Sequence, residues 1–572
     1  MSQIKVHGLG GSGMHVVSLS STEITLSDLF FKIQAFSGIL PQNQIVLSPH
    51  HGTTLHWKDR AILLKECGIK HGSNIKLVRN FQTQAYPSTT VQLSVYKTKV
   101  LRYLSASLVT LSTVAFLARL VVSDETLTET FPATLSLLVW WPASYLLGFC
   151  GACTAVLDVG HWLAGFPIVP SAVFTLIDKG TKQIKAQAAN ASSVGALNSV
   201  ELYLVKLLNH FVPSLVRESE SMVARNAKGI QMLHENYGGT RVRFVCADGV
   251  AIDGMHISPL QGSHGKSGGS SRRGEKCYIV VNGNAEFYEM DGLYRELRCS
   301  CCFVYFLVPV VFCTRTLILI HALFLSFHLS VCFLCCVSKL PDQQHSNAAR
   351  YRSLGFHVLL FNYRGVGVSE GAPTRDGLLL DLHAVVKFAL ASTQMGGLNI
   401  DASNVVVCGR SLGGAISTLL LSEMVQEEPN LILINTRSFS TLRAAASKLL
   451  GQNYGERVGR GAAIGIRLLG WELNALQGWS TLTTGYRWIE SVGDDDIILP
   501  GAKLIDHLDC SSSSSSSSSQ PLRIIRLDVN CGGSGHNRAL KSSEYVKRYQ
   551  MIQEALVWNT ERVVNVDSKK KI

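Results

Sequence analysis

The chain is 572 residues long, which is too long for one compact domain and predicts about two to four folded units. Hydrophobic residues make up 47% of it and charged residues only 16%, a balance that is unusual for a soluble protein and indicates membrane segments. The net charge of +12 is spread along the chain without a basic stripe interleaved with aromatic residues, which argues against nucleic acid as a partner and favours an anionic membrane surface.

Residues 1–80 alternate short strands with one helix. The stretch "IKVHGLGGSGMHVVSL" predicts a hairpin, and "TLSDLFFKIQAFSG" predicts a helix capped at Thr25 or Ser27. This order, with Pro41 after the helix and the ending "LLKECGIKHGSNIKLV", resembles the ubiquitin-like β-grasp domain. No di-glycine follows Val78, so the resemblance implies a built-in module that binds a protein partner, and argues against a tag conjugated to other proteins.

Residues 97–180 have the composition of a membrane region. The stretches "LSASLVTLSTVAFLARLVV" and "FPATLSLLVWWPASYLLGFCGACTAVL" are each long enough to span a bilayer, and "HWLAGFPIVPSAVFTLI" is a shorter apolar run. Lysine and arginine flank the region on both sides, and acidic residues fill the loop after the first span. The positive-inside rule therefore predicts a multi-pass helical hairpin whose third run lies at the interface and whose soluble domains face the cytosol. A buried helical hairpin in a soluble protein is the alternative.

Residues 186–238 are typical of an amphipathic helical connector, and residues 240–565 alternate strands with helices. "TRVRFVCADGVAIDGMHISP" predicts a hairpin turned at Asp248-Gly249. "CYIVVNGNAE", "FHVLLFNYRG" and "NVVVCGRSLGG" predict parallel strands, and "GLLLDLHAVVKFAL" predicts a crossover helix. The fold class that follows is α/β, with a doubly wound and mostly parallel sheet.

The stretch "VVVCGRSLGGAIS" predicts a nucleophile on a turn from strand to helix. Flanking glycines in Gly-x-Ser-x-Gly leave the room that lets the helix pack close to the strand, and the turn exposes the serine hydroxyl at the carboxyl end of the sheet. Ser411 is therefore the candidate nucleophile. The amide of Leu412 would open a helix N-terminus, where an oxyanion can be stabilised. A structural turn that happens to contain serine is the alternative.

A catalytic serine needs a base and an orienting acid, which follow it in this fold in the order acid, then histidine. His536 lies in the glycine-rich stretch "CGGSGHNRAL" before the last predicted helix and is the candidate base, with a surface-loop histidine as the alternative. Asp496 is the first choice of acid because Gly493 precedes it by three residues and a proline follows, and Asp494 and Asp495 are the fallbacks.

Residues 240–565 resemble the α/β-hydrolase superfamily, and particularly its membrane-anchored serine hydrolases, through "NYRGVGVSEGAPTRDGLLLDLHAVVKFA", "VVVCGRSLGGAIS", the aspartate loop and "GGSGHN". The resemblance implies a triad of Ser411, Asp496 and His536, and no metal or cofactor. It also implies an oxyanion hole made by the amide of Leu412 and a second amide at Asn284 or Ala285. The sequence departs from the usual His-Gly pair at that loop, which leaves the second donor open.

Other segments fit the resemblance less well. Residues 298–340 form an apolar, cysteine-rich insert that is a third membrane segment, a lipid-entry flap or extraneous sequence, and the last is slightly favoured because a span there would divide the sheet. Residues 511–519 are a serine run typical of a flexible linker. Residues 436–485 predict a helical cap. The final Lys-Lys-Lys-Ile resembles the dilysine retrieval signal of endoplasmic-reticulum membrane proteins, and a solvated basic tail is the equal alternative.

These features together favour a membrane-embedded serine hydrolase that cleaves ester or thioester bonds of a membrane lipid or acylated substrate. One rival is a catalytically silent adaptor that uses the ubiquitin-like region to bind a protein partner. The other is amide hydrolysis or acyl transfer on the same fold. The sequence identifies neither the acyl chain nor the head group, and it leaves the oligomeric state open.

Overall fold

The structure is a computed structural model that describes residues 2–82, 171–188, 201–206, 213–260, 274–283, 347–508, 523–527 and 535–569, with short gaps inside several of these ranges, and also Tyr288. Several expected features lie outside the described residues: the two predicted membrane spans, the insert 298–340, the linker 511–519, the last three residues, and Asn284 and Ala285.

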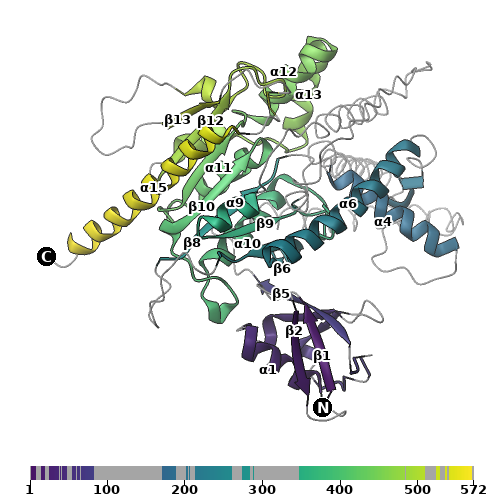
Figure 1. The fold of residues 1–572 in the computed structure, drawn as a ribbon. Helices are drawn as coiled ribbons and strands as arrows, with labels where there is room; N and C mark the ends of the chain where they lie inside the picture. The colour runs from purple at the N-terminus through teal and green to yellow at the C-terminus, as the bar shows by residue number, and fades with distance from the viewer. Residues whose placement is uncertain are drawn as a thin grey trace, which may run out of the picture.

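One mixed sheet runs through the described part of the chain (Figure 1). Its strand order is β13-β12-β11-β10-β8-β9-β7-β6-β5-β1-β2, and β3 pairs with β5 and β4. The strand bounds are β1 Ser2–His7, β2 Met14–Leu19, β3 Gln44–Leu47, β4 Thr54–His56, β5 Asn74–Gln82, β6 Thr240–Val245, β7 Ala251–Ile257, β8 Lys276–Val281, β9 Phe356–Phe361, β10 Val405–Arg410, β11 Ile432–Thr436, β12 Arg487–Val492 and β13 Arg523–Leu527.

The second half of this sheet confirms the predicted α/β architecture. All neighbouring pairs from β9 through β8 and β10 to β13 are parallel. The antiparallel hairpin of β6 and β7 continues the sheet beyond β9, and its turn contains Asp248 and a Gly249 with φ of 85°. Parallel strands place their carboxyl ends along one edge, so residues that follow β10, β11, β12 and β13 gather there.

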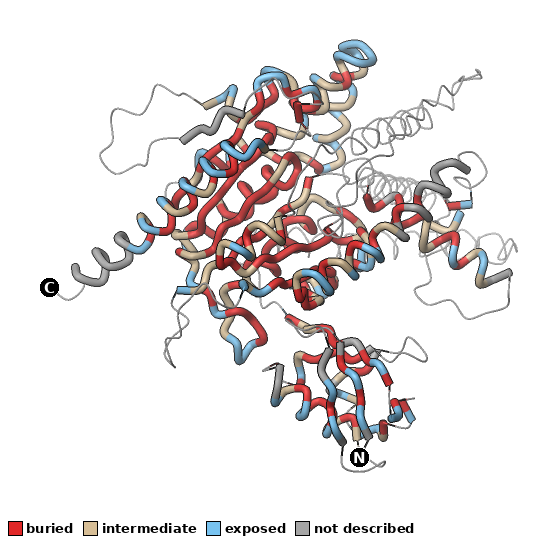
Figure 2. The backbone as a smooth tube through the Cα atoms, in the orientation of Figure 1, coloured by how far each residue is buried: buried red, intermediate tan, exposed pale blue. Residues whose placement is uncertain are grey.

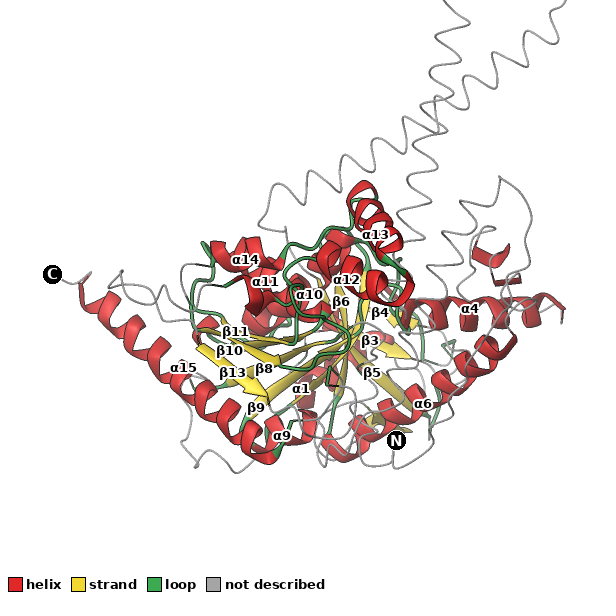
Figure 3. Ribbon diagram, turned by 90° about the horizontal axis from the view of Figure 1, so that it is seen from above, coloured by secondary structure: helices red, strands yellow, loops and turns green. Residues whose placement is uncertain are grey.

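Helices cover both faces of the parallel strands (Figure 3). Their bounds are α1 Leu26–Ser37, α4 Ser171–Ala188, α6 Pro213–Tyr237, α9 Asn347–Ser353, α10 Arg375–Leu390, α11 Leu412–Met424, α12 Leu442–Tyr454, α13 Glu456–Leu468, α14 Ala475–Thr481 and α15 Ser542–Lys569, with short 3₁₀ turns at Pro41–Asn43, Trp57–Asp59, Thr393–Met395, Ala402–Asn404 and Leu504–His507. Helices α10, α11 and α14 contribute to one hydrophobic core cluster, α9 and α15 contribute to the other, and α6 contributes to both through Met222 and Leu233.

The two core clusters follow from the two-residue period of a strand. Successive side chains point to opposite faces of a sheet, so a strand that is covered on both sides is apolar throughout. In β10, Val405 and Val407 belong to the first cluster, and Val406 and Cys408 belong to the second. The central strands are accordingly the most continuously buried part of the chain (Figure 2).

The N-terminal region has its own hydrophobic core, at the end of the sheet formed by β5, β1 and β2. β1 pairs antiparallel with β2 and parallel with β5, β3 pairs antiparallel with β5 and β4, and Leu26, Phe30 and Ile33 of α1 are buried in this core. Thr25 directly precedes α1, and the Asp28 carboxylate accepts bonds from the Thr25 amide at 3.0 Å and the Thr25 hydroxyl at 2.8 Å. The ubiquitin-like resemblance of this region stays a prediction.

One strand joins the N-terminal region to the α/β sheet, which the sequence did not predict. The last part of β5 pairs in parallel with β6, with Arg79 opposite Val242 and Gln82 opposite Val245. The ring of Phe81 packs edge-on against that of Phe388 on α10, with 5.2 Å between centroids. The described part of the chain thus shares one continuous sheet.

The end of the third apolar run is the first part of α4. Phe174 and Ile177 lie in the first core cluster, and the Ser219 hydroxyl of α6 donates to the carbonyl of Phe174 at 2.8 Å. The Thr175 hydroxyl accepts from the amide of Gly367 at 2.7 Å. The expected position at the membrane interface is therefore wrong for these residues, which form part of a buried helix. Within the described residues, no helix combines the length and apolar character needed to cross a bilayer.

Candidate active site

Ser411 occupies a strained turn between β10 and α11. Its φ of 52° and ψ of −116° are unfavourable for a residue with a side chain, at a cost on the order of 1–3 kcal/mol. The neighbouring chain holds the strain in place: the amide of Ser411 donates to the carbonyl of Thr436 at 2.9 Å, and its carbonyl accepts from the Ser438 hydroxyl at 2.8 Å. A nucleophile elbow requires this conformation.

The positions two residues before and after Ser411 must be glycine because the backbone of neighbouring segments lies too close to leave room for a Cβ atom. A Cβ on Gly409 would lie 2.3 Å from the carbonyl oxygen of Gly413, and a Cβ on Gly413 would lie 2.3 Å from that of Val281 in β8. Real Cβ atoms essentially never come so close. The glycines therefore let α11 begin directly against two strands, and Leu412, the first residue of α11, has its amide at the helix N-terminus.

His536 and Asp495 form the buried acid–base pair of the site. The imidazole Nδ1 lies 2.9 Å from both carboxylate oxygens of Asp495, and each residue is only 4% exposed. Asp495 follows β12 and His536 follows β13, so both lie at the edge of the sheet where Ser411 ends β10. The structure therefore brings the predicted base to a buried carboxylate at the expected edge.

The carboxylate that contacts the imidazole differs from the first choice of acid. Asp496 is exposed, and its carboxylate accepts the backbone N–H of His536 at 3.1 Å. Asp494 is also exposed, and its carbonyl oxygen is so close to Gly535 that a Cβ there would lie 2.4 Å away. The imidazole partner is Asp495, which the sequence offered only as a fallback.

A tight turn explains why Asp495 points inward. Its Oδ1 accepts the amides of Ile497 at 3.0 Å and Ile498 at 2.7 Å, so the carboxylate is fixed over its own turn. Burial alone would raise the pKa of Asp495, but His536 and the two amides outweigh it and lower the pKa below the ordinary value. The Lys503 ammonium donates to two carbonyls at the end of β12, each at 2.7 Å, and fixes the base of the same loop.

Arg437, which the sequence did not indicate as part of the site, lies between Ser411 and His536. It is 5% exposed and has a φ of 54°, unusual for a non-glycine residue. Its Nη1 donates to the carbonyl of His536 at 2.6 Å, and its amide donates to the carbonyl of Glu490 at 2.8 Å. The residues on either side of it, Thr436 and Ser438, hold Ser411. The only sequence signal for Arg437 was its position directly after a buried strand.

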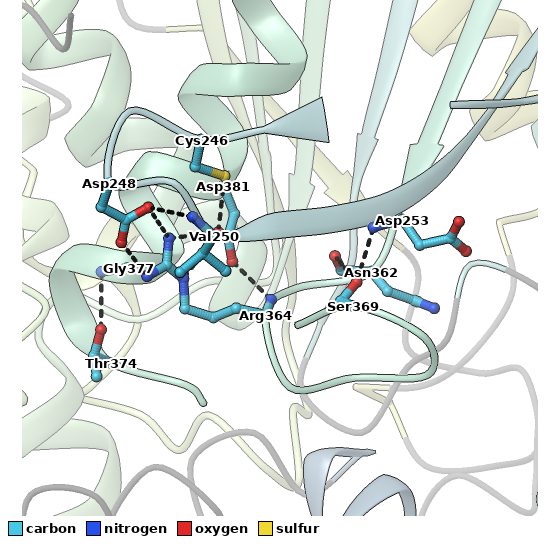
Figure 4. Close-up of polar contacts among 10 residues, drawn as sticks. All are labelled: Cys246, Asp248, Val250, Asp253, Asn362, Arg364, Ser369, Thr374, Gly377 and Asp381. Atoms are coloured by element: carbon cyan, nitrogen blue, oxygen red, sulfur yellow. Dashed lines mark hydrogen bonds and ion pairs between the residues drawn. The ribbon is translucent and has the colours of Figure 1, made fainter. Parts of the chain in front are cut away.

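A second buried network fixes the chain after β9 (Figure 4). The Arg364 Nη1 donates to Asp248 at 2.8 Å, its Nε donates to Asp381 at 2.9 Å, and its amide donates to the other oxygen of Asp381 at 2.8 Å. Burial alone would lower the pKa of Arg364, but the two carboxylates raise it above its ordinary value. These carboxylates neutralise the guanidinium, so the motif "NYRGVG" contributes structure here.

The same loop is tied to the chain that follows β8. The Ser369 hydroxyl accepts the amide of Asp253 at 2.9 Å and donates to the carbonyl of Asn362 at 3.1 Å. The Asn362 side chain accepts the amide of Tyr288 at 3.0 Å, and the Tyr288 hydroxyl donates to Asp253 at 2.8 Å. These bonds fix Tyr288, which lies just after Asn284 and Ala285.

The described residues combine a strained serine, a buried imidazole and an ionised carboxylate along one sheet edge, which is the set of groups used in nucleophilic acyl transfer. Within that part of the chain, no three histidine, cysteine, aspartate or glutamate side chains are grouped so as to hold a metal ion.

A family model for the alpha/beta hydrolase fold matches residues 315–459, about a quarter of the chain, and includes Ser411. The chain has an α/β-hydrolase fold. Among solved structures, this α/β-hydrolase-fold chain is similar to an alpha-beta hydrolase from Vibrio vulnificus, with a TM-score of 0.36 and 14% identity over 58% of this chain and 85% of that one. That score is too low to add to the assignment.

Curated relatives of this α/β-hydrolase-fold chain match it over a short segment. The alpha/beta hydrolase domain-containing protein WAV2 of Arabidopsis thaliana is 36% identical over 99 residues, 17% of this chain and 30% of that protein. An uncharacterized membrane protein of Saccharomyces cerevisiae is 36% identical over 90 residues, 15% and 28% of the two chains. The lysophosphatidylserine lipase ABHD12 of Gallus gallus is 34% identical over 95 residues, 16% and 23%. The chain thus spans less than a third of the length of each of these relatives.

Proposed function

We propose that this protein is a serine hydrolase that cleaves carboxylic ester or thioester bonds of lipid-like substrates through an acyl-enzyme. The observation that carries the proposal is the connected loop at residues 436–438. It holds the strained Ser411 on one side and, through Arg437, the backbone of His536 on the other, and His536 is paired with the buried Asp495.

Each group has one role in this mechanism. His536 accepts the proton of the Ser411 hydroxyl at Nε2, because Nδ1 is bonded to Asp495, and the serine oxygen attacks the carbonyl carbon. The amide of Leu412 stabilises the oxyanion of the tetrahedral intermediate. His536 then gives the proton to the departing alcohol or thiol, which leaves an acyl-serine. Water then loses a proton to His536 and attacks the acyl-serine, and His536 returns that proton to the Ser411 oxygen as the carboxylic acid leaves. Asp495 stabilises the imidazolium throughout.

Two observations support a lipid-like substrate at a membrane. One relative is named a lysophosphatidylserine lipase and another a membrane protein, and residues 101–177 contain apolar stretches of spanning length. We infer that the two apolar stretches within residues 104–157 anchor the chain as a multi-pass protein with its soluble domains facing the cytosol, and that residues 1–80 bind a protein partner. Retention in membranes after alkaline carbonate extraction is the expected result, and release into the supernatant would contradict the anchoring.

The catalytic proposal is tested by labelling the full chain with a fluorophosphonate probe, which reacts with activated serines. We expect labelling that Ser411→Ala abolishes and Ser422→Ala preserves. Ser422 is a matched control because it lies on α11 and its hydroxyl bonds to the carbonyl of Leu419 within that helix, at 2.7 Å. A folded wild-type protein that does not label would refute the proposal and favour the silent adaptor. Labelling without turnover of esters or thioesters would favour acyl transfer or amide hydrolysis.

A further inference from the structure

Helix α13 exposes one face that carries three arginines and two large apolar side chains. Arg457, Arg460, Ile464, Arg467 and Leu468 are spaced by three, four, three and one residues, which places them on the same side of a helix. All five are exposed, and Ile464 and Leu468 retain 60% and 71% of their accessible surface. Ile464 and Leu468 are one helical turn apart, so they form an adjacent exposed apolar pair beside the three arginines.

The opposite face of α13 is fixed to the protein. Gly459 packs so closely on α12 that a Cβ would lie 2.3 Å from the carbonyl oxygen of Ser447. Ile466 and Leu469 pack against the first core cluster. The packing that positions α13 therefore also turns its mixed cationic and apolar face away from the core.

The helical hairpin of α12 and α13 stands out at the margin of the domain, and it lies on the same side of the sheet as α11 and α14 (Figure 3). Its first helix begins at Leu442, shortly after Arg437 and Ser438. The exposed face is thus carried by the segment that directly follows the loop of the candidate active site.

The composition of this face selects its partner. None of the ion pairs between described residues involves Arg457, Arg460 or Arg467, and Glu456, at the start of the helix, is the only acidic residue of α13. A polyanion such as nucleic acid would satisfy the arginines but leave Ile464 and Leu468 in water. A bilayer that contains anionic lipids satisfies both, because head-group phosphates and carboxylates bind guanidinium groups while apolar side chains enter the acyl boundary.

We propose that α13 is an interfacial helix that docks the α/β domain on an anionic lipid bilayer. The arginines lie in the head-group layer, and Ile464 and Leu468 enter the layer beneath it. The docking brings the loop of residues 436–438 toward the membrane surface. It is a binding property and does not depend on hydrolysis.

The test uses the full chain in nanodiscs of phosphatidylcholine alone or of phosphatidylcholine with phosphatidylserine. A polarity-sensitive dye is attached through a non-canonical amino acid at position 468, and separately at position 546 as a control. Val546 is 56% exposed on α15, which covers the other face of the sheet. We expect the dye at 468 to shift to the blue in anionic nanodiscs and to be quenched by lipids that carry a nitroxide on the acyl chain, and the dye at 546 to do neither.

Charge variants separate docking from a local effect of the dye. Arg457→Gln, Arg460→Gln and Arg467→Gln combined should reduce the docking equilibrium constant by about fivefold per arginine, and the corresponding lysine variants should retain it. A dye at 468 that reports water in both kinds of nanodisc would overturn the proposal and make the face a site for a protein or a second copy. Docking that is equal in the glutamine and arginine forms would overturn the electrostatic part.

Discussion

The choice between Asp495 and Asp496 makes the sharpest test of the site, because the two carboxylates are adjacent in sequence and differ in what they contact. In Asp495→Asn the Oδ1 position already accepts the amides of Ile497 and Ile498, so the new NH₂ group takes the place of Oδ2, one of the two oxygens that lie 2.9 Å from Nδ1 of His536. An NH₂ donor beside Nδ1 favours the ring tautomer that carries its proton on Nε2, where it cannot accept the proton of Ser411. The charge that stabilises the imidazolium is lost as well.

The expected loss in kcat is on the order of 10³- to 10⁴-fold, or about 4 to 5.5 kcal/mol of transition-state stabilisation. Asp496→Asn is the matched control. Its side chain is exposed and accepts the backbone amide of His536, and an asparagine oxygen can still accept that bond. We expect it to remain within about threefold of the wild type.

The assay is steady-state hydrolysis of a soluble p-nitrophenyl ester, with the rate of fluorophosphonate labelling as a second measurement and thermal unfolding as a check on folding. Because His536 and the turn amides lower the pKa of Asp495, its carboxylate stays ionised at neutral pH, and Asp495→Asn should be impaired across the whole neutral range. Equal losses for the two variants, or a larger loss for Asp496→Asn, would refute the assignment of the acid.

Three further predictions concern buried charged or titratable groups. Arg437→Ala removes the hydrogen bond to the His536 carbonyl. In steady-state kinetics it should lower kcat by about 10- to 100-fold with little change in KM. A change confined to KM would contradict the positioning role of Arg437. Glu490 and Arg548 form a buried ion pair in which the two side chains are 1% and 8% exposed. Because Glu490→Gln leaves Arg548 without its counter-charge, it should lower the free energy of unfolding by about 3 to 5 kcal/mol in chemical denaturation, and adding Arg548→Met should recover part of that loss. A loss below about 1 kcal/mol would contradict this. Burial lowers the pKa of His383 from 6.5 to about 3. Between these two pH values His383 binds a proton in the unfolded chain but not in the folded protein. The free energy of unfolding therefore falls as the pH falls, by up to about 1.4 kcal/mol per pH unit. His383→Leu should flatten this part of the dependence of Tm on pH, and an unchanged slope would be the contrary result.

Much of the site could be predicted because its signals are local. A run of apolar residues ending in Gly409, followed by Ser411 and Gly413, describes a strand, a strained turn and a helix within a short stretch, and steric exclusion of a Cβ at both glycines leaves few alternatives. His536 could be predicted from chain order, because the connections of a parallel sheet fix which loops meet at its carboxyl edge.

The acid could not be selected in the same way. Asp494, Asp495 and Asp496 have the same chemistry, and the direction of each side chain on an irregular loop depends on the turn it adopts. Bonds to Ile497 and Ile498 and the approach of the loop after β13 turn Asp495 inward. These contacts span about forty residues of sequence, and no local pattern records them.

The sequence alone determined the α/β class and singled out Ser411 and His536 as candidates, because apolar periodicity and glycine sterics act over a few residues. Tertiary structure alone decided three things: the pairing of β5 with β6, the role of Arg437 as the link between Ser411 and His536, and the outward face of α13. Each depends on which surfaces meet after the chain has folded, and the free energy of such contacts is set by residues far apart in the sequence.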